Sequence, residues 1–572
     1  INGGTYENNQ YCPIYINGAV SSENSTLTVK NATITALPGD SNQDNGVAVY
    51  LAGYSTSTFT RTTITAPVTG LEIRAGKLTL TNCTVTGGSG EVVTNANGNG
   101  TTVTNAAVAI SQHTTKKDID VTITGGTYTA TAAVYQTNVQ GTGSENVKVS
   151  IKSGTFKGAV SAETNNTVAV SGGTFSSAVK EEYCATGYIP VANGDGTYGV
   201  ELSNYVVVGG IKGFENTKFA SFADAYDAIK PVLEKICAND PLGEGTPANA
   251  AAFDAVFTDV KDGRATLTYT ITGNVTYDET GYANLLTMGR RSSHYLTNER
   301  HLINFKFVGA EAERGATLTV NSNITLPYEW WGEKITTAIS FENLTITGSA
   351  SNGLYTYQHY FEGIDFKVNN CTLKGIKIYN CANVGGSYTI TNSTLDGTGA
   401  PAGAYAIHLQ GNETAPLNIT ISGNQISGYN RGINIDQNTA VATISGNTIG
   451  INDVNRSCIQ LTRLASTEVK DNTLNLNGGN AFTLHKNLAA GSKINIAGNT
   501  INNDGYLIYD NTKQNIALTY TNNTITGNVD TTKGVYGGNT YALTDGVDVV
   551  INGVKAAQIG DVKYETLAEA IA

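Results

Sequence analysis

The chain has 572 residues, a formal net charge of −12 and a pI near 5.1, and 14% of its residues are charged. This acidic balance argues against a nucleic-acid partner, because affinity for phosphates depends on Lys and Arg. No apolar run approaches the ~18 residues of a membrane span, so we expect no membrane insertion within this sequence. The length leaves room for several domains.

The chain opens on a repeat in which apolar residues alternate with small polar ones, with Gly126, Gly154 and Gly173 at the bend of the last three copies. The copies are residues 29–34, 59–64, 80–85, 123–128, 151–156 and 170–175. Alternation with period two predicts strands. Residues 1–6 already match the pattern and Ile1 is no initiator Met. We therefore interpret the chain as a piece of a longer protein.

The repeat stops near residue 177 and a different pattern follows. Residues 193–200 contain Asp-Gly between two strand-like segments, which predicts a hairpin that covers the open edge of the last strand. Beyond residues 205–212, Ser221 and Asp224 resemble a capping box. An apolar stripe then runs to Pro231, which stops or kinks a helix. We predict a capping helix at about residues 221–235.

The end of the chain repeats this junction. Residues 549–555 match 205–212, and Thr566 with Glu569 forms a full capping box. We predict three parts: a partial first module with a hairpin cap over residues 1–201, a complete second module over 202–545, and the start of a third over 546–572.

The second module carries one Asn in each copy of its repeat. Residues 444–449 (Ile-Ser-Gly-Asn-Thr-Ile) have relatives that place Asn424, Asn447, Asn472, Asn499 and Asn523 at equivalent positions. The steps between them are 447−424=23, 472−447=25, 499−472=27 and 523−499=24 residues. Repeats of this length predict a stacked solenoid rather than an antiparallel sandwich. We expect these Asn side chains to form a ladder and to take the left-handed bend, with Leu344, Cys371 and Ser393 at the equivalent places earlier.

The junctions resemble those of a known group of proteins. Residues 172–200, with Gly-Asp-Gly-Thr-Tyr-Gly-Val at the end, and residues 559–571 are similar to repeat modules of multi-module β-helix surface adhesins of gut Gram-positive anaerobes. The resemblance implies right-handed parallel β-helix modules, each with a short N-terminal capping helix. It also implies secretion, display on the cell wall and contact with host glycoprotein, mucin glycan or immunoglobulin.

Insertions that interrupt the second repeat are the first candidate site. They include the densest cationic stretch and the chain's two tryptophans. Insertions in a solenoid often collect on the binding flank, and Trp and Tyr give rigid contact area. The alternative is that Trp330 and Trp331 pack against the capping helix. The candidate ligand-binding residues are Arg290, Arg291, His294, Tyr295, Tyr328, Trp330, Trp331, Tyr355, Tyr357, His359 and Tyr360.

A polar face of the second module is the alternative site. Alternation sends Ile407, Ile433 and Ile459 inward and leaves two outward rows. We expect one row to hold Lys377, His408, Asn434, Gln460 and Thr483, and the other to hold Tyr379, Gln410, Asp436, Thr462, His485 and Asp510. His408 and Asp436 belong to adjacent repeats. Asp436 and Asp510 are about 14 Å apart at ~4.8 Å per repeat, beyond the 5 to 9.5 Å or so of a glycosidase pair.

We conclude from the sequence that the chain is an all-β, right-handed parallel β-helix protein acting as a non-catalytic surface adhesin. We expect no catalytic residues, no cofactor and no metal. The alternatives are a carbohydrate-active enzyme, a lyase or glycosidase using His408, Asp436 and His485, and a passive stalk that displays another domain.

Overall fold

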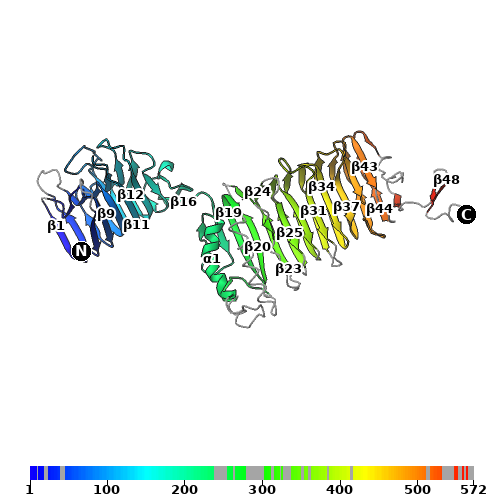
Figure 1. Ribbon diagram of the computed structural model, residues 1–572, viewed down its shortest axis with the longest axis horizontal. Coiled ribbons are helices and arrows are strands. Elements are labelled where there is room, and N and C mark those ends of the chain that lie inside the picture. Colours follow the sequence, from blue (N-terminus) through cyan, green and yellow to red (C-terminus); the bar gives the residue numbers. More distant parts are fainter. Residues whose placement is uncertain are drawn as a thin grey trace. The chain divides into compact units, whose positions relative to one another are not determined.

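Two compact units, Ile1–Ser203 and Asn204–Ala572, divide the chain. In the computed structural model (Figure 1) the described residues are 1–9, 11–18, 24–38, 46–237, 254–261, 264–277, 302–310, 315–321, 324–325, 336–348, 353–358, 363–382, 385–411, 417–510, 516–530, 547–551, 557–559 and 562–564.

The first unit is a coil of mostly parallel strands in which each turn, here called a rung, stacks on the one before. Its elements are β1 (Thr5–Asn8), β2 (Ile14–Ile16), β3 (Ser25–Lys30), β4 (Thr33–Ala36), β5 (Val47–Leu51), β6 (Ser55–Thr60), β7 (Thr63–Thr65), β8 (Thr69–Ile73), β9 (Gly76–Thr86), β10 (Ala106–Ser111), β11 (Ile119–Thr137), β12 (Val147–Ala162), β13 (Val168–Val170), β14 (Thr174–Phe175), a 3-10 helix (Glu181–Tyr183), β15 (Tyr188–Ala192) and β16 (Tyr198–Leu202).

Residues of the same kind stack from rung to rung in this unit. Inside, Tyr128, Phe156 and Phe175 form a column with ring centroids 5.0 and 4.9 Å apart. Outside, the register aligns a row of threonines: Thr5, Thr33, Thr63, Thr84, Thr127, Thr155 and Thr174. Aromatic and Thr–Thr neighbours stabilise adjacent strands, so the period-two pattern fixes the register on both faces.

An antiparallel hairpin closes the end of the first unit. β15 pairs with β16, and β16 pairs antiparallel with β14, which is the last strand of the coil. The hairpin therefore occupies the edge that a further parallel strand would use.

The second unit builds most rungs from three strands (Figure 1). Two of them belong to a large sheet: β17 (Tyr205–Gly209), β18 (Lys218–Phe219), β19 (Arg264–Tyr277), β20 (Leu302–Gly309), β21 (Ala316–Val320), β23 (Thr336–Glu342), β24 (Thr345–Gly348), β26 (Gly363–Asn369), β27 (Thr372–Lys374), β29 (Gly385–Thr391), β30 (Thr394–Asp396), β32 (Leu417–Ser422), β33 (Gln425–Tyr429), β35 (Ala440–Ser445), β36 (Thr448–Ile451), β38 (Ser466–Lys470), β39 (Thr473–Asn475), β41 (Lys493–Ala497), β42 (Thr500–Asn502), β44 (Ile516–Thr521), β45 (Thr524–Ile525) and β47 (Val547–Ile551).

The third strand of each rung belongs to a smaller sheet, here called the third sheet: β22 (Ile324–Thr325), β25 (Gly353–Gln358), β28 (Lys377–Ala382), β31 (Tyr405–Gly411), β34 (Arg431–Gln437), β37 (Ser457–Arg463), β40 (Asn480–Leu484), β43 (Gly505–Asp510) and β46 (Val529–Asp530). A hairpin of β48 (Ala557–Ile559) and β49 (Val562–Tyr564) follows. The third module predicted over residues 546–572 stays a prediction, since residues 565–572 lie outside the described ones.

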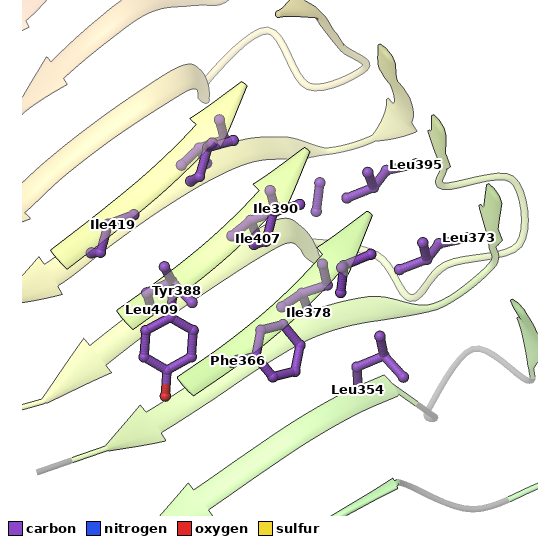
Figure 2. Packing of buried hydrophobic residues seen from close by; sticks show 14 of the residues in the cluster. Leu354, Phe366, Leu373, Ile378, Tyr388, Ile390, Leu395, Ile407, Leu409 and Ile419 are labelled. Atoms are coloured by element: carbon purple, nitrogen blue, oxygen red, sulfur yellow. The ribbon is translucent and has the colours of Figure 1, made fainter. Parts of the chain in front are cut away.

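Side chains from all three strands of a rung meet in the interior. Figure 2 shows Tyr388, Ile390 and Leu395 of one rung facing Ile407 and Leu409. All five are 0% exposed. A buried aliphatic side chain contributes about 1.5–3 kcal/mol, so the stacked core stabilises the coil one rung at a time.

The Asn ladder is present, and the bend lies one residue earlier than we predicted. The side-chain amides of Asn424 and Asn447 donate to the carboxamide oxygen of the next Asn at 2.9 Å. The left-handed residue is the one before each ladder Asn, as at Gly423 (φ 67°) and Gly446 (φ 64°). The prediction that Asn itself takes this conformation is wrong, because the ladder amide must point into the core while the preceding residue turns the chain.

The helix predicted at about 221–235 spans Phe222–Cys237 (α1) and lies at the β19 end of the second unit (Figure 1). Ser221 Oγ accepts the Asp224 N–H at 3.1 Å and donates to the Asp224 carboxylate at 2.7 Å. Phe222 is buried against Tyr269 and Tyr277, with centroids 5.6 and 5.7 Å away. The helix thus covers the apolar end of the core.

Candidate functional site

The aromatic and cationic insertions fall largely outside the described residues. Tyr355 and Tyr357 lie on β25, and their side chains lie outside the described part of the structure. The other predicted contacts stay predictions and lie outside the described part of the chain: Arg290, Arg291, His294, Tyr295, Tyr328, Trp330, Trp331, His359 and Tyr360.

The third sheet carries the alternative polar face. Ile407, Ile433 and Ile459 are 0% exposed and point into the core, as the alternation predicted. Polar and aromatic side chains alternate with them on the outer face. We call the following set the polar strip: Tyr379, Tyr405, His408, Arg431, Asn434, Asp436, Gln460, Thr462, Arg463, Thr483 and His485.

The register of the two outward rows differs from our prediction at three places. One is at the end of the second row, where Asp510 lies opposite Leu484 rather than beside His485. His408 lies opposite Tyr379, whereas Lys377 lies opposite Gly353. Asp436 lies opposite Arg463 rather than Thr462, because the pairing of β34 with β37 shifts by one residue after Ile435. The alternation predicted which residues point outward. It contained no information on such shifts between rungs.

A chain of hydrogen bonds runs across three rungs of the strip. Arg431 Nη1 donates to Tyr405 Oη at 3.1 Å, and this hydroxyl donates to Gln460 Oε1 at 3.1 Å. Gln460 Nε2 then donates to Thr462 Oγ1 at 2.9 Å, and Thr462 donates to Asn434 Oδ1 at 2.8 Å. Each group is oriented by its neighbour, so the strip is preorganised. Asn434 and Thr462 are buried, at 3% and 4% exposure, and hold Gln460 and Tyr405 in place.

His408 lies between two tyrosines. Its ring centroid is 5.1 Å from Tyr379 and 4.9 Å from Tyr405. The pKa of His408 is lowered to about 4, chiefly by burial; the Asp436 charge raises it, and the charges of Arg431 and Lys377 lower it. The imidazole is therefore neutral at neutral pH. No hydrogen bond joins His408 to Asp436, and His408 Nε2 has no partner among the described residues.

The carboxylate of the strip is engaged in an ion pair. Asp436 Oδ1 accepts a hydrogen bond from Arg463 Nε, and Arg463 Nη2 donates to the Asp436 carbonyl at 3.3 Å. Nearby, burial lowers the pKa of His485, whose Nδ1 accepts the Asn487 N–H at 3.3 Å. A glycosidase needs two carboxyl groups. Among the described side chains of the third-sheet strands β28, β31, β34, β37 and β40, only Asp436 offers one.

Metal binding finds no support in the described part of the chain, where no group of three or more His, Cys, Asp or Glu residues could hold an ion. Within the same residues, no helix is long and apolar enough to cross a bilayer. The strip thus offers neutral donors and acceptors, aromatic rings, the Arg431 guanidinium and one ion pair.

Part of the second unit matches a known protein-family model. Residues 374–549 match the model of the right-handed beta helix region. This part of the chain is a right-handed parallel β-helix. With the parallel sheets, the match confirms the predicted fold class and supports a β-helix repeat protein, a broad family that includes adhesins and carbohydrate-active enzymes. No curated protein matches the chain.

Tyr405 and Arg431 are the members of the strip that sequence reasoning missed. They are opposite each other at the start of β31 and β34, and the Arg431 guanidinium lies 4.9 Å from the centre of the Tyr405 ring. An aromatic and a cation at the same repeat position were visible in the sequence. The predicted strands began one residue later, at Ala406 and Gly432, and therefore left Tyr405 and Arg431 outside.

Proposed function

We propose that the second unit is a non-catalytic binding module of a bacterial cell-surface adhesin, and that its polar strip contacts sugar hydroxyls of a host glycoprotein or mucin glycan. The chain of hydrogen bonds from Arg431 through Tyr405 and Gln460 to Asn434 carries this proposal. Amides, hydroxyls and tyrosine rings in a fixed arrangement are the groups that typically orient a polar ligand and stack on its apolar faces.

The protonation states favour binding over catalysis. A general acid or base works best with a pKa near the working pH, whereas the pKa of His408 is about 4. Asp436 is held by Arg463, with no second described carboxylate on the strands around it. These groups can donate and accept hydrogen bonds to a sugar without exchanging protons with it.

Two further parts of the proposal rest on the sequence. The insertions around Arg290 to Tyr295, Tyr328 to Trp331 and Tyr355 to Tyr360 would give a second, aromatic contact, and alanine substitutions there should weaken binding. The resemblance of the module junctions supports secretion and display on the cell wall.

The experiment measures binding of the full chain to intact mucin, to deglycosylated mucin and to immunoglobulin. We expect binding that is lost on deglycosylation and weakened about fivefold or more by Tyr405→Ala or Gln460→Ala, as for a central contact residue. Asn418→Ala, an exposed change on β32 of the large sheet, is the matched control and should bind like wild type.

Other outcomes separate the alternatives. Binding that survives deglycosylation, or that appears only with immunoglobulin, means protein recognition. New reducing ends or unsaturated products would identify an enzyme. An absence of binding to all three analytes would favour a passive stalk.

A further inference from the structure

Five side chains of β28, β31 and β34 form a continuous group on the third sheet, here called the cationic cluster: Lys377, Tyr379, Tyr405, His408 and Arg431. Lys377 Nζ lies 5.9 Å from the centre of the Tyr379 ring, and the Arg431 guanidinium lies 4.9 Å from that of Tyr405. The His408 ring is in contact with both tyrosines. The three rings thus form a row with a cation at each end.

Neither cation of the cluster is in an ion pair with a described residue. No described carboxylate lies within the 4.0 Å of an ion pair from Lys377 or Arg431. The carboxylate of Asp436, on the same strand as Arg431, is bound by Arg463. Lys377 and Arg431 are half-buried, so each keeps a surface that a ligand can reach.

The charge of this sheet is opposite to that of the whole chain. The described side chains of β28, β31, β34, β37 and β40 include three cations, Lys377, Arg431 and Arg463, and one carboxylate, Asp436. The chain as a whole carries a formal charge of −12. A predominantly acidic surface repels anions, so an anionic ligand is directed to the few places where cations outnumber carboxylates.

His408 is affected by both cations of the cluster. Burial is the main cause of its low pKa, and the charges of Lys377 and Arg431 lower that pKa as well, against the opposing charge of Asp436. The two cations therefore lie close enough to act on the same imidazole ring. An anion bound between them would interact with both.

Two nitrogen atoms of the cluster lack a hydrogen-bond partner. Arg431 Nη1 donates to Tyr405 Oη at 3.1 Å. Arg431 Nε and His408 Nε2 are shielded from solvent and have no partner among the described residues. Unpaired buried polar groups are unfavourable and call for an explanation such as a bound ion. Because arginine binds oxyanions through pairs of N–H donors, an oxyanion would supply the acceptor that Arg431 Nε lacks.

We propose that the cationic cluster binds the carboxylate or sulfate group of an acidic glycan. The anionic group lies against Arg431 and Lys377, and the apolar face of the sugar that carries it packs on Tyr405 or Tyr379. This inference rests on the function proposed above. It narrows the ligand from a glycan in general to a glycan with negative charge.

The test measures binding of the full chain to five forms of one mucin: intact, without sialic acid, without sulfate, without both, and fully deglycosylated. We expect affinity to fall about tenfold when both anionic groups are removed, because charge-assisted hydrogen bonds are lost. A loss on removal of sialic acid alone identifies a carboxylate, and a loss on removal of sulfate alone identifies a sulfate. Added salt should weaken binding to intact mucin more than binding to mucin without either group.

Two variants locate the anion on the cluster. Arg431→Gln and Lys377→Gln should each weaken binding to intact mucin about fivefold or more, as for a central contact. Lys377→Gln should leave binding to mucin without either anionic group unchanged, and it keeps the test decisive if Arg431→Gln, which also frees Tyr405, does not fold. Lys493→Gln, at an exposed cation on β41 of the large sheet, changes the net charge equally and should bind like wild type.

The outcomes separate this inference from the proposed function. Binding that is lost on full deglycosylation but unaffected by removal of both anionic groups would overturn the inference and leave the proposed function standing. Binding that survives full deglycosylation, or no binding to any form, would overturn both. Equal weakening by Lys377→Gln and Lys493→Gln would also overturn the inference, because net charge rather than the cluster would then be responsible.

Discussion

The carboxamide oxygen of Asn472 accepts two hydrogen bonds from Asn447, one from the backbone N–H at 3.0 Å and one from the side-chain amide at 2.9 Å. The same Asn447 amide also donates to the Ile421 carbonyl at 2.9 Å. One buried side chain therefore joins three successive rungs and satisfies polar groups that the core would otherwise leave unpaired.

Asn447→Ala should destabilise the second unit. The change removes the acceptor of the Asn424 N–H and side-chain amide, and each orphaned buried group costs about 1–3 kcal/mol. Urea unfolding followed by tryptophan fluorescence reports this unit, to which Trp330 and Trp331 both belong. Asn418→Ala, exposed on β32, should change the unfolding free energy by less than about 0.5 kcal/mol. Equal midpoints for the two variants would contradict the role of the ladder.

Gly126→Ala should destabilise the first unit strongly. Gly126 has φ 92°, and an added Cβ would lie 2.0 Å from the Cys83 carbonyl oxygen. We expect left-handed strain of about 1–2 kcal/mol plus an overpacking loss of about 1–3 kcal/mol. Gly194→Ala is the control, since its φ is 83° but nothing lies within 4 Å. Thermal unfolding by circular dichroism should rank Gly126→Ala clearly below Gly194→Ala.

Phe222→Ala should loosen the capped end of the second unit. The ring packs on Tyr269, Tyr277 and Phe307, and truncating a buried Phe costs about 3–5 kcal/mol. Because each rung contacts only its neighbours, hydrogen exchange should quicken in β19 and leave β41 unchanged. Asp227→Ala, on the exposed side of α1, is the control. A uniform loss of protection along the second unit would contradict the prediction that the effect of Phe222→Ala stays near the helix.

His408 should stay neutral in mildly acid solution. Its pKa falls from 6.5 to about 4 on folding, so its contribution to stability is present above pH 6.5 and is lost as the pH falls through about 4. NMR titration of the six histidines, with His408→Gln for assignment, measures this pKa. Asp436→Asn should lower it further, because the Asp436 charge raises it. A midpoint near 6.5 would contradict the burial of the ring.

Alternation and repeat spacing predicted the coil, the inward isoleucines and the positions of the ladder. These features depend on which face a side chain occupies, and a period of two encodes that directly. Contacts between rungs were harder to predict from the sequence. Lys377 was assigned to the row of His408, although Tyr379 lies there. The buried Ile376, which is 1% exposed, precedes β28, and the alternation does not show at which residue a strand begins.

The buried acid of the first unit was missed for another reason. The sequence 71–74, Leu-Glu-Ile-Arg, correctly places Glu72 and Arg74 on the outer face, where charges normally meet water. Their burial depends on residues 87–105, which connect β9 to β10, share no repeat pattern, and contact Arg74 through Gly100 and Glu72 through Thr102. A segment without periodicity gives no sign in the sequence of what it covers.

The Asn ladder joins rungs of different length, since its steps are 23, 25, 27 and 24 residues. The bend geometry is the same in each, so the extra residues must be accommodated away from the ladder. Such a coil can grow or shrink in evolution by whole rungs, because a duplicated rung brings both a donor and an acceptor for its neighbours. A single inserted residue at the bend would break the ladder, whereas an entire added turn would extend it.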